Sequence, residues 1–159
     1  MKKVVLAVLV MGLAAGIGAG QAFAQEKRVE FSLNAGAMTV IGGDISFAGV
    51  LLTLTPQVDI HVAKGFMISP EAMFLTDTSF SGVVALPGAI FNYVGKGFFA
   101  GAGVVFPVSI SEGFGTGSLL PKLNIGYRGG HVNLTAYLIT DTAAMFSVNL
   151  VGASIGYRF

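Results

Sequence analysis

The stretch VGASIGYRF, residues 151–159, decides the fold class of this chain. Apolar or aromatic residues occupy every second position (Val151, Ala153, Ile155, Tyr157 and Phe159) and alternate with Gly, Ser, Gly and Arg. A period of two residues is typical of a β-strand with one apolar face. An unpaired strand at the edge of a sheet exposes free backbone N–H and C=O groups. We therefore expect this last strand to pair with the first one and to close a barrel, which has no free edge.

The same alternation continues through most of the chain after residue 28. In residues 50–63, for example, the apolar Leu52 and Leu54 alternate with the polar Thr53 and Thr55. Short glycine-containing junctions at residues 64–65, 95–97 and 129–130 separate such stretches and favour tight hairpins. The pattern predicts eight strands, over residues 28–40, 48–63, 66–76, 83–94, 98–109, 118–128, 131–140 and 147–159.

The first 24 residues have the pattern of a secretory signal. Lys2 and Lys3 precede a long uncharged apolar stretch, and Ala22, Phe23 and Ala24 form a small-residue cleavage site before the polar residues that follow. This arrangement is typical of a cleaved signal peptide, whereas a permanent membrane anchor is the weaker interpretation. We predict a signal peptide over residues 1–24 and one domain over residues 25–159.

The composition excludes several classes of protein. The mean hydropathy is +0.78, and only 11% of the residues are charged. The near-neutral charge balance does not suggest a nucleic-acid partner. Without cysteine the chain has neither disulfides nor thiolate metal ligands. Its longest uncharged run after residue 24, residues 78–95, contains Pro87 and several glycines, which argues against a membrane-spanning helix.

A chain this apolar without a spanning helix is explained by a closed β-barrel, which pairs all backbone groups and turns alternate side chains to lipid. The expected fold class is all-β: an eight-stranded antiparallel up-and-down transmembrane β-barrel, preceded by a cleaved signal peptide. In bacterial barrels the short turns lie on the periplasmic side.

The last strand also carries a family resemblance. Its ending IGYRF, with Ile155, Tyr157 and the terminal Phe159, resembles the C-terminal signal of Gram-negative outer-membrane β-barrels. The whole of residues 25–159 resembles the small OmpA/OmpX-like group of eight-stranded barrels. The resemblance implies export through the periplasm into the cell outer membrane. It also implies that outer-membrane lipids and the barrel-assembly machinery, which recognises this strand, are partners.

Residues on the polar faces of the predicted strands would point into the barrel. Near the short turns we expect a polar lumen, and we expect the mid-barrel charges Glu71 and Lys122 to face each other or to join this network, because a charge in a low-dielectric interior needs a partner. The predicted lumen network consists of Glu30, Asp59, His61, Glu71, Lys122, Arg128, His131 and Arg158.

At the other end the predicted inward residues are apolar. An eight-stranded barrel is wide enough only for filling side chains or one small ligand. These residues therefore form either a packed core or an apolar pocket. The candidates are Met38, Leu51, Met73, Leu86, Leu120, Ile139 and Leu150.

The sequence favours a non-enzymatic outer-membrane barrel with a largely closed interior and a structural or interaction role. We identify no catalytic residues, because His61 and His131 are predicted inward and no nucleophile lies with them. No metal or cofactor is expected, since three or four converging ligands are not evident. One alternative is binding of an acyl chain or another small apolar ligand in the outer half of the lumen, and a second is a narrow pore. A protein partner is a further possibility.

Overall fold

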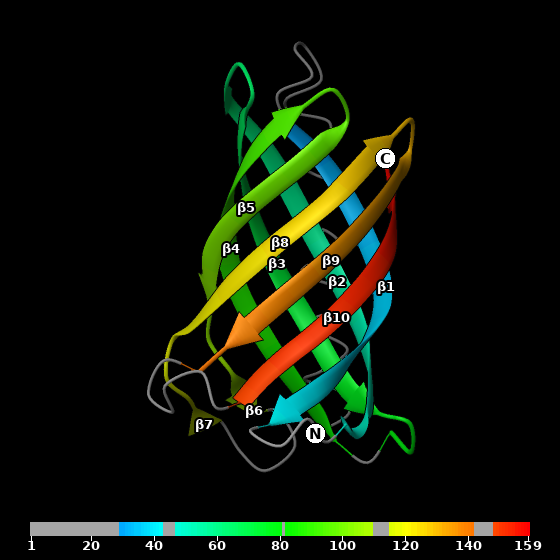
Figure 1. The fold of residues 1–159 in the computed structure, drawn as a ribbon, viewed down its shortest axis with the longest axis vertical. Helices are drawn as coiled ribbons and strands as arrows, with labels where there is room; N and C mark the ends of the chain where they lie inside the picture. Colours follow the sequence, from blue (N-terminus) through cyan, green and yellow to red (C-terminus); the bar gives the residue numbers. More distant parts are fainter. Residues whose placement is uncertain (1–28, 43–46, 81, 110–114, 142–147) are drawn as a thin grey trace, which may run out of the picture.

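A computed structural model describes residues 29–42, 47–80, 82–109, 115–141 and 148–159. The predicted signal peptide, residues 1–24, lies outside the described residues. The described residues form ten strands of one sheet (Figure 1). The strands are β1 (Val29–Gly42), β2 (Phe47–Ala63), β3 (Phe66–Asp77), β4 (Val83–Gly95), β5 (Phe98–Val105), β6 (Val108–Ser109), β7 (Gly115–Thr116), β8 (Leu120–Gly129), β9 (Val132–Thr140) and β10 (Val148–Arg158).

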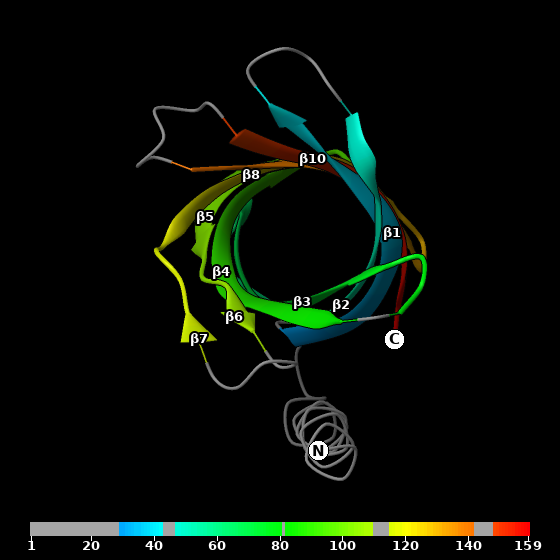
Figure 2. The ribbon, with the colours of Figure 1, turned by 90° about the horizontal axis from the view of Figure 1, so that it is seen from below.

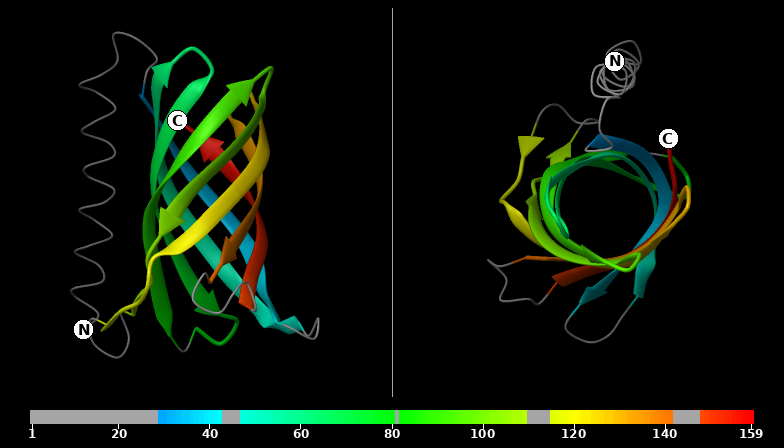
Figure 3. Two further views of the ribbon diagram at one scale, coloured as in Figure 1. Left: turned by 60° about the vertical axis from the view of Figure 1, so that its left-hand side comes forward. Right: turned by 90° about the horizontal axis from the view of Figure 1, so that it is seen from above.

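Eight long strands close into a barrel. Seven antiparallel pairings join β1, β2, β3, β4, β5, β8, β9 and β10 in chain order. The eighth pairing joins β1 to β10, with Ala35 opposite Ile155 and Ser32 opposite Arg158. Seen along the barrel axis, the strands make a complete ring (Figures 2 and 3). The predicted all-β, eight-stranded, antiparallel up-and-down barrel is confirmed, including closure of the last strand onto the first.

The strand predicted over residues 98–109 is confirmed except for an interruption at residues 106–107. β5 stops at Val105, and the short β6 resumes the pairing with β4 in the same register, with Ser109 opposite Val84, and also pairs with β7. Pro107 lies between β5 and β6 and cannot donate a backbone hydrogen bond to a neighbouring strand. Its carbonyl instead accepts from Gly117 N (2.9 Å). Residues 115–116, predicted as part of a connection, are therefore a strand.

Three tight turns form one end of the barrel, at the top of Figure 1. Lys96 and Gly97 both have positive φ (51° and 86°), the requirement of a type I′ hairpin, and Gly65 and Gly130 have positive φ in the other two turns. The turns are tied to neighbouring strands: the Gly65 carbonyl accepts from Val94 N (2.8 Å), and the Gly97 carbonyl accepts from Arg128 N (2.6 Å). This end is a continuous hydrogen-bonded rim.

The barrel is polar inside and apolar outside, which is the reverse of a water-soluble protein. Buried side chains facing the lumen include Asp59 (1% exposed) and Asn92 (0%), whereas Ile125 (61%) and Ile155 (59%) on the outer face are exposed. A one-residue slip in any strand would invert this pattern, so the alternation fixes which face each side chain takes. No helix within the described ranges is long and apolar enough to cross a membrane.

Glycines in the wall leave room for large polar side chains in the lumen. Gly101 lies opposite Asn92 on one side and Asn124 on the other. A methyl group at Gly101 would overlap the side-chain oxygen of Asn92 and would lie 2.8 Å from that of Asn124. The same arrangement recurs at Gly156, where the Asn34 amide occupies the space that a side chain would fill. Absent side chains on one strand thus make space for asparagines on its neighbours.

Candidate functional site

Arg128 is the centre of a charged cluster just inside the short-turn end. Its Nη2 donates to Glu30 Oε2 (2.6 Å) and to Asp59 Oδ2 (2.9 Å). Arg158 Nη1 donates to the same Glu30 oxygen (3.0 Å), and its Nη2 donates to the Gly130 carbonyl. The two arginines come from β8 and β10, and the two carboxylates from β1 and β2. The cluster therefore ties strands on opposite sides of the closure together.

Asp59 extends this cluster toward the middle of the barrel. Its Oδ1 accepts from Gln57 Nε2 (2.6 Å) and from Ser69 Oγ (2.7 Å). Ser69 Oγ in turn accepts from Asn92 Nδ2 (2.9 Å). Because a buried charge requires both a partner and hydrogen bonds, this saturation explains how Asp59 is buried. The arrangement compensates the negative charge of its carboxylate.

The two histidines differ in placement. His61 is half-buried, and its Nε2 lies 3.8 Å from Glu30 Oε2, at the edge of the charged cluster. His131 was predicted to point into the lumen, but it is exposed. Its Nδ1 lies 3.0 Å from the Arg158 carbonyl oxygen, and its ring stacks on Tyr157 at 5.5 Å. The reason is that His131 belongs to the turn before β9, where strand alternation does not apply.

A second charged site lies at mid-barrel height. Lys122 Nζ on β8 donates to Glu71 Oε1 on β3, across the lumen, and the two side chains are 3% and 2% exposed. The Lys122 ammonium also lies 4.9 Å from the centre of the Tyr137 ring, within the range of a cation–π interaction. The Tyr137 hydroxyl lies 3.3 Å from Thr53 Oγ1. The pair is thus held by an aromatic face as well as by its opposite charge.

Beyond this pair, toward the end opposite the short turns, the lumen is filled by apolar side chains. Met38, Met73, Leu86 and Ile139 are buried in one cluster, and Leu51, Leu120 and Leu150 are partly buried against it. All seven candidates for an apolar pocket therefore belong to a single packed core. The cluster also includes Leu75 and Val84, which strand alternation turns inward as well, and it includes Val105 and Tyr137, which sequence reasoning missed. Tyr137 has the same strand parity as Asn133 and Ile139, so the alternation of β9 could have identified it, whereas the apolar residues on both faces of β5 conceal Val105.

One small cavity lies in the lumen among the described residues. Its volume is about 20 Å³, and it lies among Asn34, Glu71, Lys122, Asn124 and Tyr137. That volume is close to what one water molecule needs, so it does not accommodate an organic ligand. Within the described ranges, no group of three or more His, Cys, Asp or Glu side chains is placed to hold a metal ion.

The residues of the C-terminal signal face outward at the short-turn end. Ile155, Tyr157 and Phe159 are all exposed. The Phe159 ring lies 5.1 Å from the Tyr157 ring and 5.6 Å from that of Phe31, and Phe159 N donates to the Phe31 carbonyl (3.0 Å). Further ring pairs, between Phe66 and Phe91, Phe66 and Tyr93, and Phe98 and Tyr127, continue around the same end. We call these outward rings the aromatic rim.

No known protein family matches the chain, and no curated protein sequence matches it. Several solved protein structures do match it. Neisserial surface protein A (NspA) superposes with a TM-score of 0.52 and 9% identity over 84% of this chain and 98% of that one. A de novo designed transmembrane β-barrel superposes with a TM-score of 0.47 and 13% identity, over 80% of this chain and 95% of the designed one. The attachment invasion locus protein Ail of Yersinia pestis was solved with the heparin analogue sucrose octasulfate. It superposes with a TM-score of 0.46 and 10% identity, over 82% of this chain and 97% of Ail.

At such low identity the comparison with NspA concerns the fold alone. NspA is an eight-stranded outer-membrane β-barrel, and the superposition covers 98% of its chain. The resemblance to small outer-membrane barrels that the C-terminal strand carries is therefore confirmed at the level of architecture: this chain has the closed eight-stranded barrel fold of that group.

Proposed function

We propose that this chain is a non-enzymatic outer-membrane β-barrel with a closed interior, exported through the periplasm and serving a structural or interaction role. The observation that carries the proposal is the inverted wall, in which polar side chains are buried in the lumen and large apolar side chains are exposed outside. Exposed apolar area on this scale is unfavourable in water. In a bilayer the same side chains face acyl chains, while the closed sheet satisfies the backbone.

The aromatic rim supports the same placement. Aromatic rings are enriched where a membrane protein crosses from hydrocarbon to headgroups. The rim rings of Phe31, Phe66, Tyr93, Tyr127 and Tyr157 gather at the short-turn end. By the resemblance of its C-terminal strand, this end faces the periplasm, and the strand is the segment that the assembly machinery would recognise.

The packed lumen supports a closed interior over the two alternatives. A narrow pore needs a polar lining from end to end, but Met38, Met73, Leu86 and Ile139 form an apolar layer across the barrel. An acyl chain in the outer half of the lumen would need the space that these side chains occupy. The Arg128 and Lys122 clusters then act as structural ties that neutralise the inward charges.

Three measurements on purified protein test this proposal. Flotation with phospholipid vesicles should show stable insertion, and planar-bilayer recordings should show no conductance steps, with a general porin as the positive control. Failure to insert would refute the membrane placement, whereas discrete steps would refute the closed interior. The intact mass of protein purified from outer membranes should correspond to residues 25–159, and a mass that retains residues 1–24 would contradict cleavage.

A further inference from the structure

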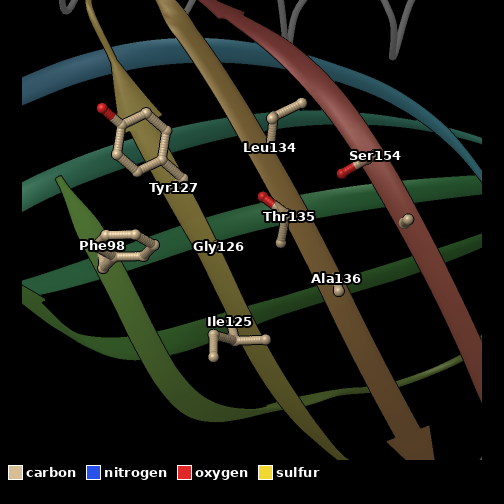
Figure 4. A pocket seen from close by; sticks show the side chains of 9 residues that line it. Phe98, Ile125, Gly126, Tyr127, Leu134, Thr135, Ala136 and Ser154 are labelled. Carbon is tan, nitrogen blue, oxygen red and sulfur yellow. The ribbon is translucent and has the colours of Figure 1, made fainter.

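The described outer wall of the barrel contains a shallow hollow near the short-turn end (Figure 4). It is a shallow, open groove of about 420 Å³ that crosses β5, β8, β9 and β10. The outward side chains that line it are Phe98, Ile125, Tyr127, Leu134, Ala136 and Ala153.

The strand register explains why the wall is hollow here. Ala136 lies opposite Ala153 on one side and opposite Ile125 on the other. Ala37 on β1 lies opposite Ala153 in turn, so a row of outward methyl groups runs across three strands, with the larger Ile125 and Leu134 beside it. The edge-to-face pair of Phe98 and Tyr127, with ring centres 5.1 Å apart, forms one wall of the groove. The result is an apolar trough bounded by rings that are held in place.

The trough begins directly beneath a basic turn. Phe98 follows the turn at Lys96 and Gly97, and the Gly97 carbonyl accepts from Arg128 N (2.6 Å), which holds this turn against β8. A methyl group on Gly97 would lie 3.0 Å from the Tyr127 ring, so the turn packs directly on a groove residue. The exposed Lys96 thus stands at the rim, at the end of the groove.

Charge at this end of the barrel is positive on the outside. Lys64 and Lys96 are exposed at the turns. The side-chain carboxylates of the same end that the structure describes, Glu30 and Asp59, point into the lumen and are paired with arginines. Lysines near a membrane surface attract anionic headgroups. An apolar trough with a cation at its headgroup end matches a phospholipid with a negatively charged headgroup.

We propose that this groove, which we call the lipid groove, binds one acyl chain of an anionic glycerophospholipid whose phosphate is held by Lys96. The inference rests on the proposed membrane placement. It identifies an anionic phospholipid as the ligand of the outer surface formed by β5, β8, β9 and β10. Wall positions outside the groove contact lipid without preference.

Native mass spectrometry of the full barrel tests the proposal, with dioleoyl phosphatidylglycerol and dioleoyl phosphatidylcholine as probes. The wild type should retain one phosphatidylglycerol in preference to phosphatidylcholine. Ala136→Phe fills the groove and should abolish this retention, whereas Ala89→Phe, at an outward position on β4 away from the groove, should not. Lys96→Gln should weaken the preference about fivefold, and Lys64→Gln, on another turn, should leave it unchanged.

The outcomes separate the site from the membrane proposal. Vesicle flotation of each variant is measured in parallel. A barrel that does not insert refutes the membrane placement. A barrel that inserts but retains both lipids equally refutes the headgroup assignment, and equal losses in Ala136→Phe and Ala89→Phe refute the groove. Unchanged selectivity in Lys96→Gln refutes the role of that lysine.

Discussion

The buried pair of Glu71 and Lys122 gives the sharpest prediction about stability. The two side chains are almost completely buried and join β3 to β8 across the lumen. Removing one member leaves the other as an uncompensated buried charge, which typically costs about 3–5 kcal/mol. We predict that Glu71→Gln and Lys122→Met each destabilise the barrel by this amount. The double variant should lose much less than the sum, because it leaves no unpaired charge.

The surroundings of the pair predict which single variant is worse. In Glu71→Gln the ammonium keeps the face of the Tyr137 ring, 4.9 Å away, and a desolvated cation–π interaction is worth up to about 2 kcal/mol. In Lys122→Met the carboxylate of Glu71 loses its ion-pair partner, and the ring interaction is lost as well. Glu71→Gln should therefore fall near the lower limit, about 3 kcal/mol, and Lys122→Met near the upper limit, about 5 kcal/mol.

Urea unfolding of the barrel in detergent micelles or vesicles, followed by circular dichroism, measures these differences. With a slope of about 2 kcal/mol per molar urea, the two variants should lower the midpoint by about 1.5 and 2.5 M. Lys64→Met, at an exposed turn, is the control and should change stability by less than about 0.5 kcal/mol. Additive losses in the double variant would show that the two residues do not stabilise each other and would refute the reasoning.

Three further predictions concern the lumen and the last strand. Gly101→Ala should destabilise the barrel by about 1–3 kcal/mol in the same assay, because the new methyl group overlaps the Asn92 oxygen; wild-type stability would contradict the tight fit. Leu86→Phe should cost a similar amount by overpacking without releasing a bound species in native mass spectrometry, whereas loss of a bound mass would favour a lumen ligand. Phe159→Ser should reduce the amount of folded barrel in outer membranes, measured by heat-modifiable gel mobility, and should leave unfolded chain; an unchanged yield would refute its role in assembly.

Most of the strand order could be predicted because the barrel depends on a two-residue alternation. Where one face is polar and the other apolar, as in residues 50–63, a register error would turn the wrong face to the lumen. The inward placement of Asp59, Glu71 and Lys122 follows from this pattern alone. Their partners do not, since which of several inward charges meet depends on strand stagger and side-chain reach. The sharing of Arg128 between two carboxylates is visible only in the structure.

The sequence-based predictions failed where the alternation of polar and apolar residues is absent or does not apply. Residues 98–109 are almost entirely apolar on both faces, so their pattern contains no signal for the interruption between β5 and β6, and only Pro107 marks it. His131 was assigned a strand parity although it lies in a two-residue turn with Gly130. The lipid groove escaped prediction for another reason. Two alanines, Ala136 and Ala153, are far apart in the sequence and become neighbours only through the pairing of β9 with β10.

The register of such a barrel must be specified mainly from inside. Outward apolar side chains contact lipid equally well if a strand slips by two residues, because lipid tails are as apolar as the side chains themselves. In the lumen the same slip would break specific matches of size. The Tyr137 ring occupies the space over Gly152, and the Phe99 ring occupies the space over Gly126, where any side chain would overlap them. A slip would place a residue with a Cβ beneath each ring. Pairs of a large residue and a glycine on adjacent strands therefore select one register, a role that the apolar surface cannot perform.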